Sequence, residues 1–235
     1  MGEPEVLLFD LYGTLVDPLS VDTELGRLFG ASAGRDLARL WRAKQVDYSF
    51  RLTLMGQYRD FRWVTARAFD DAVSALGLSI RPTEFTTPTD LYDHLPTFPD
   101  TSSGLQTLKR DGHLLAVLSN GTGSMIGSCL ANHDLRDVFS VLISADDVGA
   151  YKPSGLVYRY AAKILGRPID ELRLISSNPF DVIGAKTAGM RTAWINRAGT
   201  SFDSIGAPPD ITTASLTDLR EVLRGRQTPT PNRAQ

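Results

Sequence analysis

The fold is decided near the start of the chain, by residues 6–16, which read VLLFDLYGTLV. The apolar run Val6 to Phe9 ends at Asp10, and a turn containing Gly13 and Thr14 follows. A short apolar run bounded by a glycine turn is typical of a strand that is buried on both faces. We therefore predict a buried strand followed directly by a carboxylate at the edge of a sheet. Taken alone, Asp10 has a second interpretation, because aspartate also closes turns.

Four later segments repeat this form, an apolar run that ends in polar residues. The predicted strands are residues 114–118, 138–143, 172–175 and 192–195. Helical patterns lie between them, at residues 104–109, 124–132, 156–165 and 182–188. Strands that alternate with helices indicate βαβ units and a parallel sheet. Because ligands of such sheets bind at the carboxyl ends of the strands, we expect all five polar loops to converge on one crevice.

Residues 18–98 differ from the rest because they contain no convincing strand. Apolar residues at helical spacing predict two long helices, over 35–54 and 58–76, with shorter ones at 21–29 and 83–94. We predict an α/β fold, a Rossmann-like parallel sheet core with an inserted all-helical cap domain over the carboxyl edge of the sheet. The predicted boundaries are 1–17 and 99–225 for the core, 18–98 for the cap, and 226–235 for a disordered tail.

The composition is that of an ordinary globular protein without a strong electrostatic bias. Of the 235 residues, 42% are hydrophobic, and 27 acidic side chains nearly balance 25 basic ones. No basic block predicts nucleic-acid binding, and no apolar run is long enough to span a bilayer. The single cysteine, Cys129, cannot form an intrachain disulfide and is typical of a small buried hydrophobe. We see no signal peptide and expect a cytoplasmic protein that acts on a small molecule, not on nucleic acid or a membrane.

Five short motifs occur in order along the chain. They are DLYGT at 10–14, LWRAKQ at 40–45, LSNG at 118–121, YKP at 151–153 and SSNPFD at 176–181, the last followed by WINR at 194–197. With these motifs and the helical insertion, the chain resembles the haloacid dehalogenase superfamily, and within it most closely the L-2-haloacid dehalogenases. The resemblance extends from about Leu7 to Arg197 and implies a hydrolase acting on carbon–halide bonds.

Position 12 separates the branches of this superfamily. Its phosphatases carry a second aspartate two residues after the nucleophile, which acts as general acid on the leaving group. This chain has Tyr12 instead, and a phenol with a pKa near ~10 is a poor substitute. With Tyr12 and Ser177 at these positions, the chain also has fewer acidic side chains where the superfamily binds magnesium. We therefore expect no metal and no cofactor, with Lys152 and Arg42 supplying the positive charge.

The resemblance implies a two-step mechanism centred on Asp10. Its carboxylate would attack C2 of a small (S)-2-haloacid, displace the halide and form an aspartyl ester. Water would then attack the ester carbonyl of Asp10, so that a single displacement at C2 yields a 2-hydroxy acid of inverted configuration. The halide leaves as an anion and needs no general acid, and Lys152 nearby would keep Asp10 ionised.

The motifs also imply roles for the remaining candidates. Ser119, with backbone N–H groups ahead of a helix, would hold the substrate carboxylate. Arg42 and Asn120 would cradle the halide, while Asn178 and Asp181 would hold the hydrolytic water. The predicted catalytic set is Asp10, Thr14, Arg42, Ser119, Lys152, Tyr158, Ser176, Asn178 and Asp181. The predicted substrate-binding set is Leu11, Tyr12, Arg42, Phe61, Ser119, Asn120 and Phe180.

Several candidates keep ordinary structural interpretations at this stage. Lys152 before a proline could simply precede a helix, and Asp181 could complement a helix dipole. Arg42 could be a solvated helix residue. Ala43 and Phe180 depart from the glutamine and tryptophan that relatives commonly carry, which leaves the substrate range open, fluoroacetate included.

Two rival functions remain on the same residues. One is a magnesium-dependent phosphatase of this superfamily, and the other is a non-catalytic binding protein that keeps the fold. The resemblance also suggests a homodimer formed through the cap helices.

Overall fold

A six-stranded parallel sheet lies at the centre of the computed structural model, which describes residues 4–79 and 88–225. The strands are β1 (Val6–Phe9), β2 (Leu114–Ser119), β3 (Val141–Ser144), β4 (Leu172–Ser176), β5 (Arg191–Ile195) and β6 (Ile211–Thr213). Their order is β3-β2-β1-β4-β5-β6, and each neighbouring pair is parallel. The apolar β1 therefore lies inside the sheet between β2 and β4, and all carboxyl ends lie at one edge.

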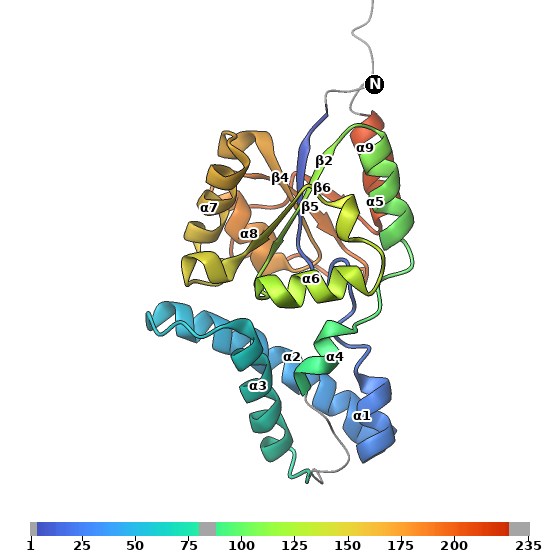
Figure 1. Ribbon diagram of the computed structural model, residues 1–235, viewed down its shortest axis with the longest axis vertical. Helices are drawn as coiled ribbons and strands as arrows, with labels where there is room; N and C mark the ends of the chain where they lie inside the picture. The colour runs from blue at the N-terminus through green and yellow to red at the C-terminus, as the bar shows by residue number, and fades with distance from the viewer. Residues whose placement is uncertain (1–3, 80–87, 226–235) are drawn as a thin grey trace, which may run out of the picture.

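Helices cover both faces of this sheet (Figure 1). On one side lie α5 (Thr101–Arg110) and α9 (Leu216–Gly225), which pack on each other, and on the other lie α7 (Gly155–Leu165) and α8 (Pro179–Thr187). α6 (Gly123–Ala131) connects β2 to β3. Its first turn is capped by Thr122, whose hydroxyl accepts a hydrogen bond from the Met125 backbone N–H at 3.2 Å.

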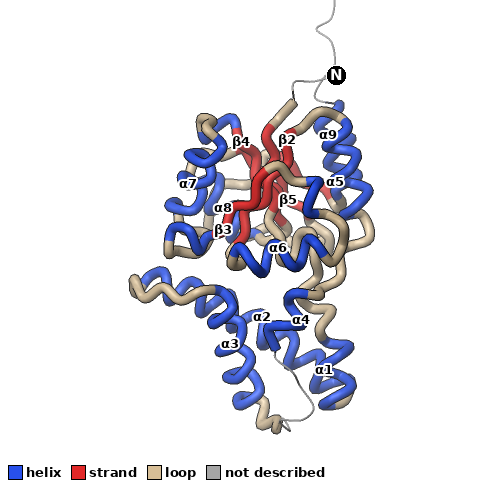
Figure 2. The backbone as a smooth tube through the Cα atoms, viewed as in Figure 1, coloured by secondary structure: helices blue, strands red, loops and turns tan. Residues whose placement is uncertain are grey.

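The chain between β1 and β2 forms a helical layer of its own. It contains α1 (Asp22–Phe29), α2 (Ala31–Leu54), α3 (Phe61–Ala75) and α4 (Pro88–Asp93). Figure 2 shows these helices gathered beyond one edge of the sheet, in a layer without strands. The predicted α/β fold with an inserted helical cap is therefore confirmed. None of the helices in residues 4–79 and 88–225 combines the length and apolarity of a membrane span.

The two chain segments that join cap and core lie side by side. The Asp17 N–H donates to the Pro96 carbonyl at 2.9 Å, and the Phe98 N–H donates to the Leu15 carbonyl at 3.0 Å. The predicted domain boundaries at residues 17/18 and 98/99 fall in these segments and stay predictions. The predicted tail at 226–235, and residues 83–87 of a predicted helix, lie outside the described residues.

Three elements differ from the sequence predictions. The strand predicted at 138–143 is wrong at its start, because Arg136–Val138 form a 3-10 turn and β3 begins at Val141. Val138 and Phe139 pack with the core although they precede the strand, so an apolar run did not mark its start. β6 and α9 were not predicted: β6 has only three residues, whereas the buried Leu216, Leu219 and Leu223 of α9 follow a helical period.

Candidate active site

Asp10 lies at the carboxyl end of the central strand. Its backbone N–H continues the ladder by donating to the Ile175 carbonyl at 3.0 Å, which fixes the residue between β2 and β4. The residue is only 5% exposed. A carboxylate at this depth needs nearby donors, because burying an unpaired charge is costly.

Four donors supply that compensation. Lys152 Nζ donates to Asp10 Oδ1 at 2.7 Å. Oδ2 receives bonds from Thr14 Oγ1 at 2.9 Å and Asn178 Nδ2 at 2.7 Å, with Ser176 Oγ at 3.4 Å. An ionised carboxylate only accepts hydrogen bonds, so this set of donors suits the anion and fixes the plane of the group.

Lys152 joins Asp10 to a second carboxylate, Asp181. The buried ammonium contacts Asp181 Oδ2 at 2.7 Å and the Leu118 carbonyl at 2.9 Å. Burial alone would lower the pKa of Lys152, but the two carboxylates outweigh burial and raise it. Burial raises the pKa of Asp181, with Lys152 acting in the opposite sense. Tyr158 completes the group by donating to Asp181 Oδ1 at 2.8 Å.

Magnesium, which phosphatases of this fold use, does not suit these residues. The carboxylates of Asp10 and Asp181 both bind the Lys152 ammonium at 2.7 Å. Position 12 offers a phenol instead of a carboxylate, and its ring stacks on Phe61. Within residues 4–79 and 88–225, no group of three or more His, Cys, Asp or Glu side chains is placed to hold a metal ion.

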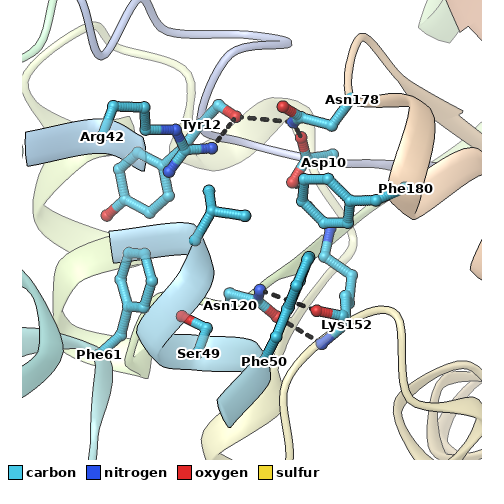
Figure 3. A pocket seen from close by; sticks show the side chains of 11 residues that line it. Asp10, Tyr12, Arg42, Ser49, Phe50, Phe61, Asn120, Lys152, Asn178 and Phe180 are labelled. Atoms are coloured by element: carbon cyan, nitrogen blue, oxygen red, sulfur yellow. Dashed lines mark hydrogen bonds and ion pairs between the residues drawn. The ribbon is translucent and has the colours of Figure 1, made fainter. Parts of the chain in front are cut away.

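A small cavity lies over Asp10, between core and cap (Figure 3). About 330 Å³ in and at the mouth of this cavity is free of protein atoms, open solvent included. The core supplies a polar base and the cap supplies most of the wall. The lining residues are Asp10, Tyr12, Arg42, Val46, Ser49, Phe50, Phe61, Asn120, Lys152, Asn178 and Phe180.

Aromatic rings from both layers form the apolar part of the wall. Tyr12 of the core stacks on Phe61 of the cap with ring centroids 5.6 Å apart. Phe50 of α2 meets Phe180 of α8 edge-on at 5.1 Å. Burial raises the pKa of Tyr12 well above its usual value, so its phenol is a much weaker proton donor than the aspartate that phosphatases carry at this position.

Arg42 extends from α2 into the same cavity. Its Nη1 donates to Gln45 Oε1 at 2.7 Å, and its Nη2 lies 3.4 Å from the Tyr12 carbonyl oxygen. Asn178 Nδ2 also donates to that carbonyl, at 3.0 Å, so the Arg42 and Asn178 side chains meet there (Figure 3). Asn120 holds the Lys152 backbone, accepting from its N–H at 2.8 Å.

The structure divides the predicted residues into three groups. Eight of them line the cavity: Asp10, Tyr12, Arg42, Phe61, Asn120, Lys152, Asn178 and Phe180. Four others lie behind the cavity. Thr14 and Ser176 donate hydrogen bonds to Asp10, Asp181 accepts one from Lys152, and Tyr158 donates one to Asp181. Leu11 and Ser119 are fully buried and do not line the cavity; Ser119 Oγ accepts the Gly121 N–H at 3.1 Å.

The expectation that five loops converge on one crevice is wrong in part. The loops after β1, β2 and β4 line the cavity, as does the Lys152 segment ahead of α7. The loop after β5, with Asn196 and Arg197, lines a neighbouring cavity instead. The connection from β3 to α7 is divided: Lys152 at its far end lines the cavity, whereas Asp146 at its start lies outside it and accepts a hydrogen bond from the cap residue Tyr58 at 2.7 Å. β5 lies two strands away from β1, roughly 10 Å at ~4.8 Å per strand, which accounts for the separate cavity that its loop lines.

Sequence reasoning missed three lining residues, all on α2. Val46, Ser49 and Phe50 follow Arg42 by four, seven and eight positions. These spacings place the four residues on one face of a helix. Once Arg42 was assigned to the site, the helical period could have identified the others.

The comparisons with known proteins agree with this geometry. The model of a family described as haloacid dehalogenase-like hydrolases matches residues 4–189. The chain belongs to this haloacid dehalogenase-like family.

Relatives within the haloacid dehalogenase-like family cover nearly the whole chain. An (S)-2-haloacid dehalogenase of Pseudomonas sp. strain YL is 38% identical over 92% of this chain and 93% of its own length. Haloacetate dehalogenase H-2 of Moraxella sp. strain B is 37% identical over 90% of this chain and 94% of its own length. A structure of the L-2-haloacid dehalogenase of Xanthobacter autotrophicus with covalently bound chloropropionic acid superposes with a TM-score of 0.87, at 30% identity, covering 95% of this chain and 99% of that one.

Proposed function

We propose that this protein is an (S)-2-haloacid dehalogenase, which converts small 2-haloacids to 2-hydroxy acids through an ester on Asp10. The observation that carries the proposal is the nucleophile itself. A buried, four-fold hydrogen-bonded carboxylate faces a small, aromatic-walled cavity, and the place of the phosphatase acid is taken by Tyr12. The full-length relatives that carry this activity in their names support the same reading.

In the first step the Asp10 carboxylate attacks C2 from the side opposite the halogen. The new C–O bond forms as the carbon–halogen bond breaks, and the halide leaves with the bonding electrons. Holding the carboxylate and C2 in line can lower the activation barrier by roughly 7–11 kcal/mol. The role of Lys152 is to keep Asp10 charged and oriented, supported by their 2.7 Å contact.

Arg42 receives the departing halide in this proposal. It enters the cavity from the cap while Lys152 lies at its base, so the two cations approach from different layers. Asn120 shares this role from the core, and the substrate carboxylate lies toward its loop, which the Ser119 hydroxyl fixes by accepting the Gly121 N–H. Leu11 supports the wall from behind, since it is buried below the lining residues.

In the second step water attacks the ester carbonyl of Asp10, and the hydroxy acid leaves with its inverted centre intact. Asp181 takes a proton from the water and passes it to the departing alkoxide oxygen of the hydroxy acid as the Asp10 carboxylate is restored. The raised pKa of Asp181 makes it a better proton acceptor than an ordinary carboxylate. Asn178 positions the water, and Tyr158 positions Asp181 by donating a hydrogen bond to it.

A single turnover in H₂¹⁸O with enzyme in excess tests this route. We expect the label in the Asp10 carboxylate, found by mass spectrometry of the peptide that contains it, and halide release that EDTA does not reduce. Label found only in the hydroxy acid would mean that water attacks C2 directly. Phosphate release from a phosphomonoester with Mg²⁺, without dehalogenation, would favour the phosphatase instead.

We also propose that the enzyme is a cytoplasmic homodimer, as its resemblance to the L-2-haloacid dehalogenases suggests. Exposed apolar side chains on the cap support a contact there: Leu54 at the end of α2, Met55 directly after it, and Trp63 on α3. The buried free thiol of Cys129 suits a reducing compartment. Sedimentation velocity of wild type and Trp63→Glu tests the dimer; two monomeric profiles would contradict it.

A further inference from the structure

The two cations of the site are held in different ways. Lys152 contacts two carboxylates, so its charge is more than balanced by Asp10 and Asp181. Among the described residues Arg42 has two acceptors, and both are neutral: the Gln45 amide oxygen at 2.7 Å and the more distant Tyr12 carbonyl oxygen at 3.4 Å. A guanidinium oriented by neutral acceptors keeps its charge available for an anion.

Gln45 is the stronger of these two acceptors and is itself completely buried on α2. It follows Arg42 by three positions, which places the two side chains next to each other on the helix surface. A buried amide has both an acceptor and a donor end, and only the acceptor end can hold a guanidinium. Which end faces Arg42 therefore decides whether Gln45 holds the cation or repels it.

The orientation of the amide is set by α3. The Thr65 hydroxyl donates its only hydrogen to the Phe61 carbonyl at 2.7 Å, one turn earlier in the helix. Its oxygen can then only accept, and it accepts from Gln45 Nε2 at 2.7 Å. With Nε2 bound to Thr65, Oε1 faces Arg42. Trp41 Nε1 fixes the same turn of α3 by donating to the Thr65 carbonyl at 2.8 Å.

We propose that Gln45, oriented by Thr65, is a positioning residue that holds Arg42 in place while leaving its positive charge free for the departing halide. The inference rests on the proposed function, in which Arg42 receives that halide. It assigns Gln45 and Thr65 to carbon–halogen cleavage and not to ester hydrolysis. A glutamate at position 45 would keep the shape but pair with Arg42 and neutralise it.

The test measures the two chemical steps separately in single turnovers with 2-chloropropionate and 2-bromopropionate. For Gln45→Glu we expect halide release to slow about 100-fold with chloride, in the range for loss of one charge-stabilising contact. The loss should be smaller with bromide, which is the better leaving group, and decay of the ester should change by less than about twofold. Gln57→Glu, an exposed cap residue, is the matched control and should match wild type.

Thr65 provides a second, independent test that adds no charge. Thr65→Val removes the hydroxyl that orients the amide and should slow halide release about tenfold, the value of one hydrogen bond. Thr65→Ser, which restores the hydroxyl, should recover it. Equal slowing of both steps, or the same loss for both halides, would overturn the inference and indicate a purely structural role.

Arg42→Lys separates failure of this inference from failure of the proposed function. If Arg42→Lys slows halide release but Gln45→Glu and Thr65→Val do not, only the positioning role is wrong. If Arg42→Lys leaves halide release unchanged, Arg42 does not receive the halide and the proposed function itself must be revised.

Discussion

The base and the wall of the cavity are held together by different kinds of interaction. At the base, Lys152 and Asp181 are almost completely buried, and the ammonium joins two carboxylates through 2.7 Å contacts. In the cap wall, Arg42 is half-buried and Phe50 meets the core through an edge-on ring contact at 5.1 Å. In the proposed mechanism the core fixes the reacting carboxylate, while the cap decides what enters and stabilises what leaves. Changes at the base should therefore affect whether chemistry occurs, and changes in the wall should affect which halide and which chain length is used.

Asp10→Ala gives the largest expected effect because it removes the nucleophile. Single-turnover halide release should fall by about 10⁶-fold, as for other covalent catalysts. The protein should stay folded, since Lys152 keeps Asp181 as a partner. Asp203→Ala, at an exposed site, serves as control. Residual turnover above about one per cent would show that the base does not hold the reacting group.

Lys152→Met tests how far the base depends on one charge. Removing one partner of a buried ion pair should lower the free energy of unfolding by about 3–5 kcal/mol, measured by urea unfolding. Because the pKa of Lys152 is raised in the folded state, the stabilisation is complete below pH 10.5, the ordinary lysine value, and is lost as the pH rises through the higher folded value. The exposed Lys163→Met should change stability by less than about 0.5 kcal/mol. Equal effects from the two variants would remove the distinction between base and surface.

Asp181 should give the base a pH signature that the wall lacks. Its pKa is raised by burial, so the carboxylate takes up a proton at a higher pH than the ordinary value of 3.8. Ester hydrolysis should therefore fall on acidification before a free carboxylate would titrate, and Asp181→Asn should slow it about 100-fold. The measurement is ester decay against pH after a halide burst. An acid limb at or below pH 3.8 would contradict the assignment of Asp181 as proton acceptor.

The smallest expected effect comes from the wall. Phe180→Trp enlarges one ring of the Phe50–Phe180 pair and should reduce the cavity. We expect the ratio of kcat/KM for 2-chlorobutyrate over chloroacetate to fall about tenfold, within the range for one or two methylenes in a pocket. Phe29→Trp, in α1, controls for a general effect of a larger ring. An unchanged ratio would mean that the two rings do not limit chain length.

Much of the fold and site could be predicted from the sequence because local patterns carried the information. The unbroken apolar run ahead of Asp10 specified a buried strand, and alternating patterns specified a parallel sheet with its polar loops at one edge. The resemblance of the YKP and SSNPFD motifs to the haloacid dehalogenase superfamily implied that Lys152 and Asp181 belong to the site of Asp10, and in the structure Lys152 contacts both carboxylates. The same reasoning failed for β6, since three residues at an edge carry too little pattern to recognise.

By itself the sequence determined the chemical type of the site, because Asp10 at a strand end and Tyr12 in place of an acid depend only on identity and spacing. Only the tertiary structure decided which loops meet and which partners each group takes. Strand order placed the loop after β5 at a neighbouring cavity, and packing of α2 on α3 turned the Gln45 amide toward Arg42. The reason is physical: periodicity shows which face of an element is buried, but hydrogen-bond direction and charge balance depend on atoms far apart in the chain.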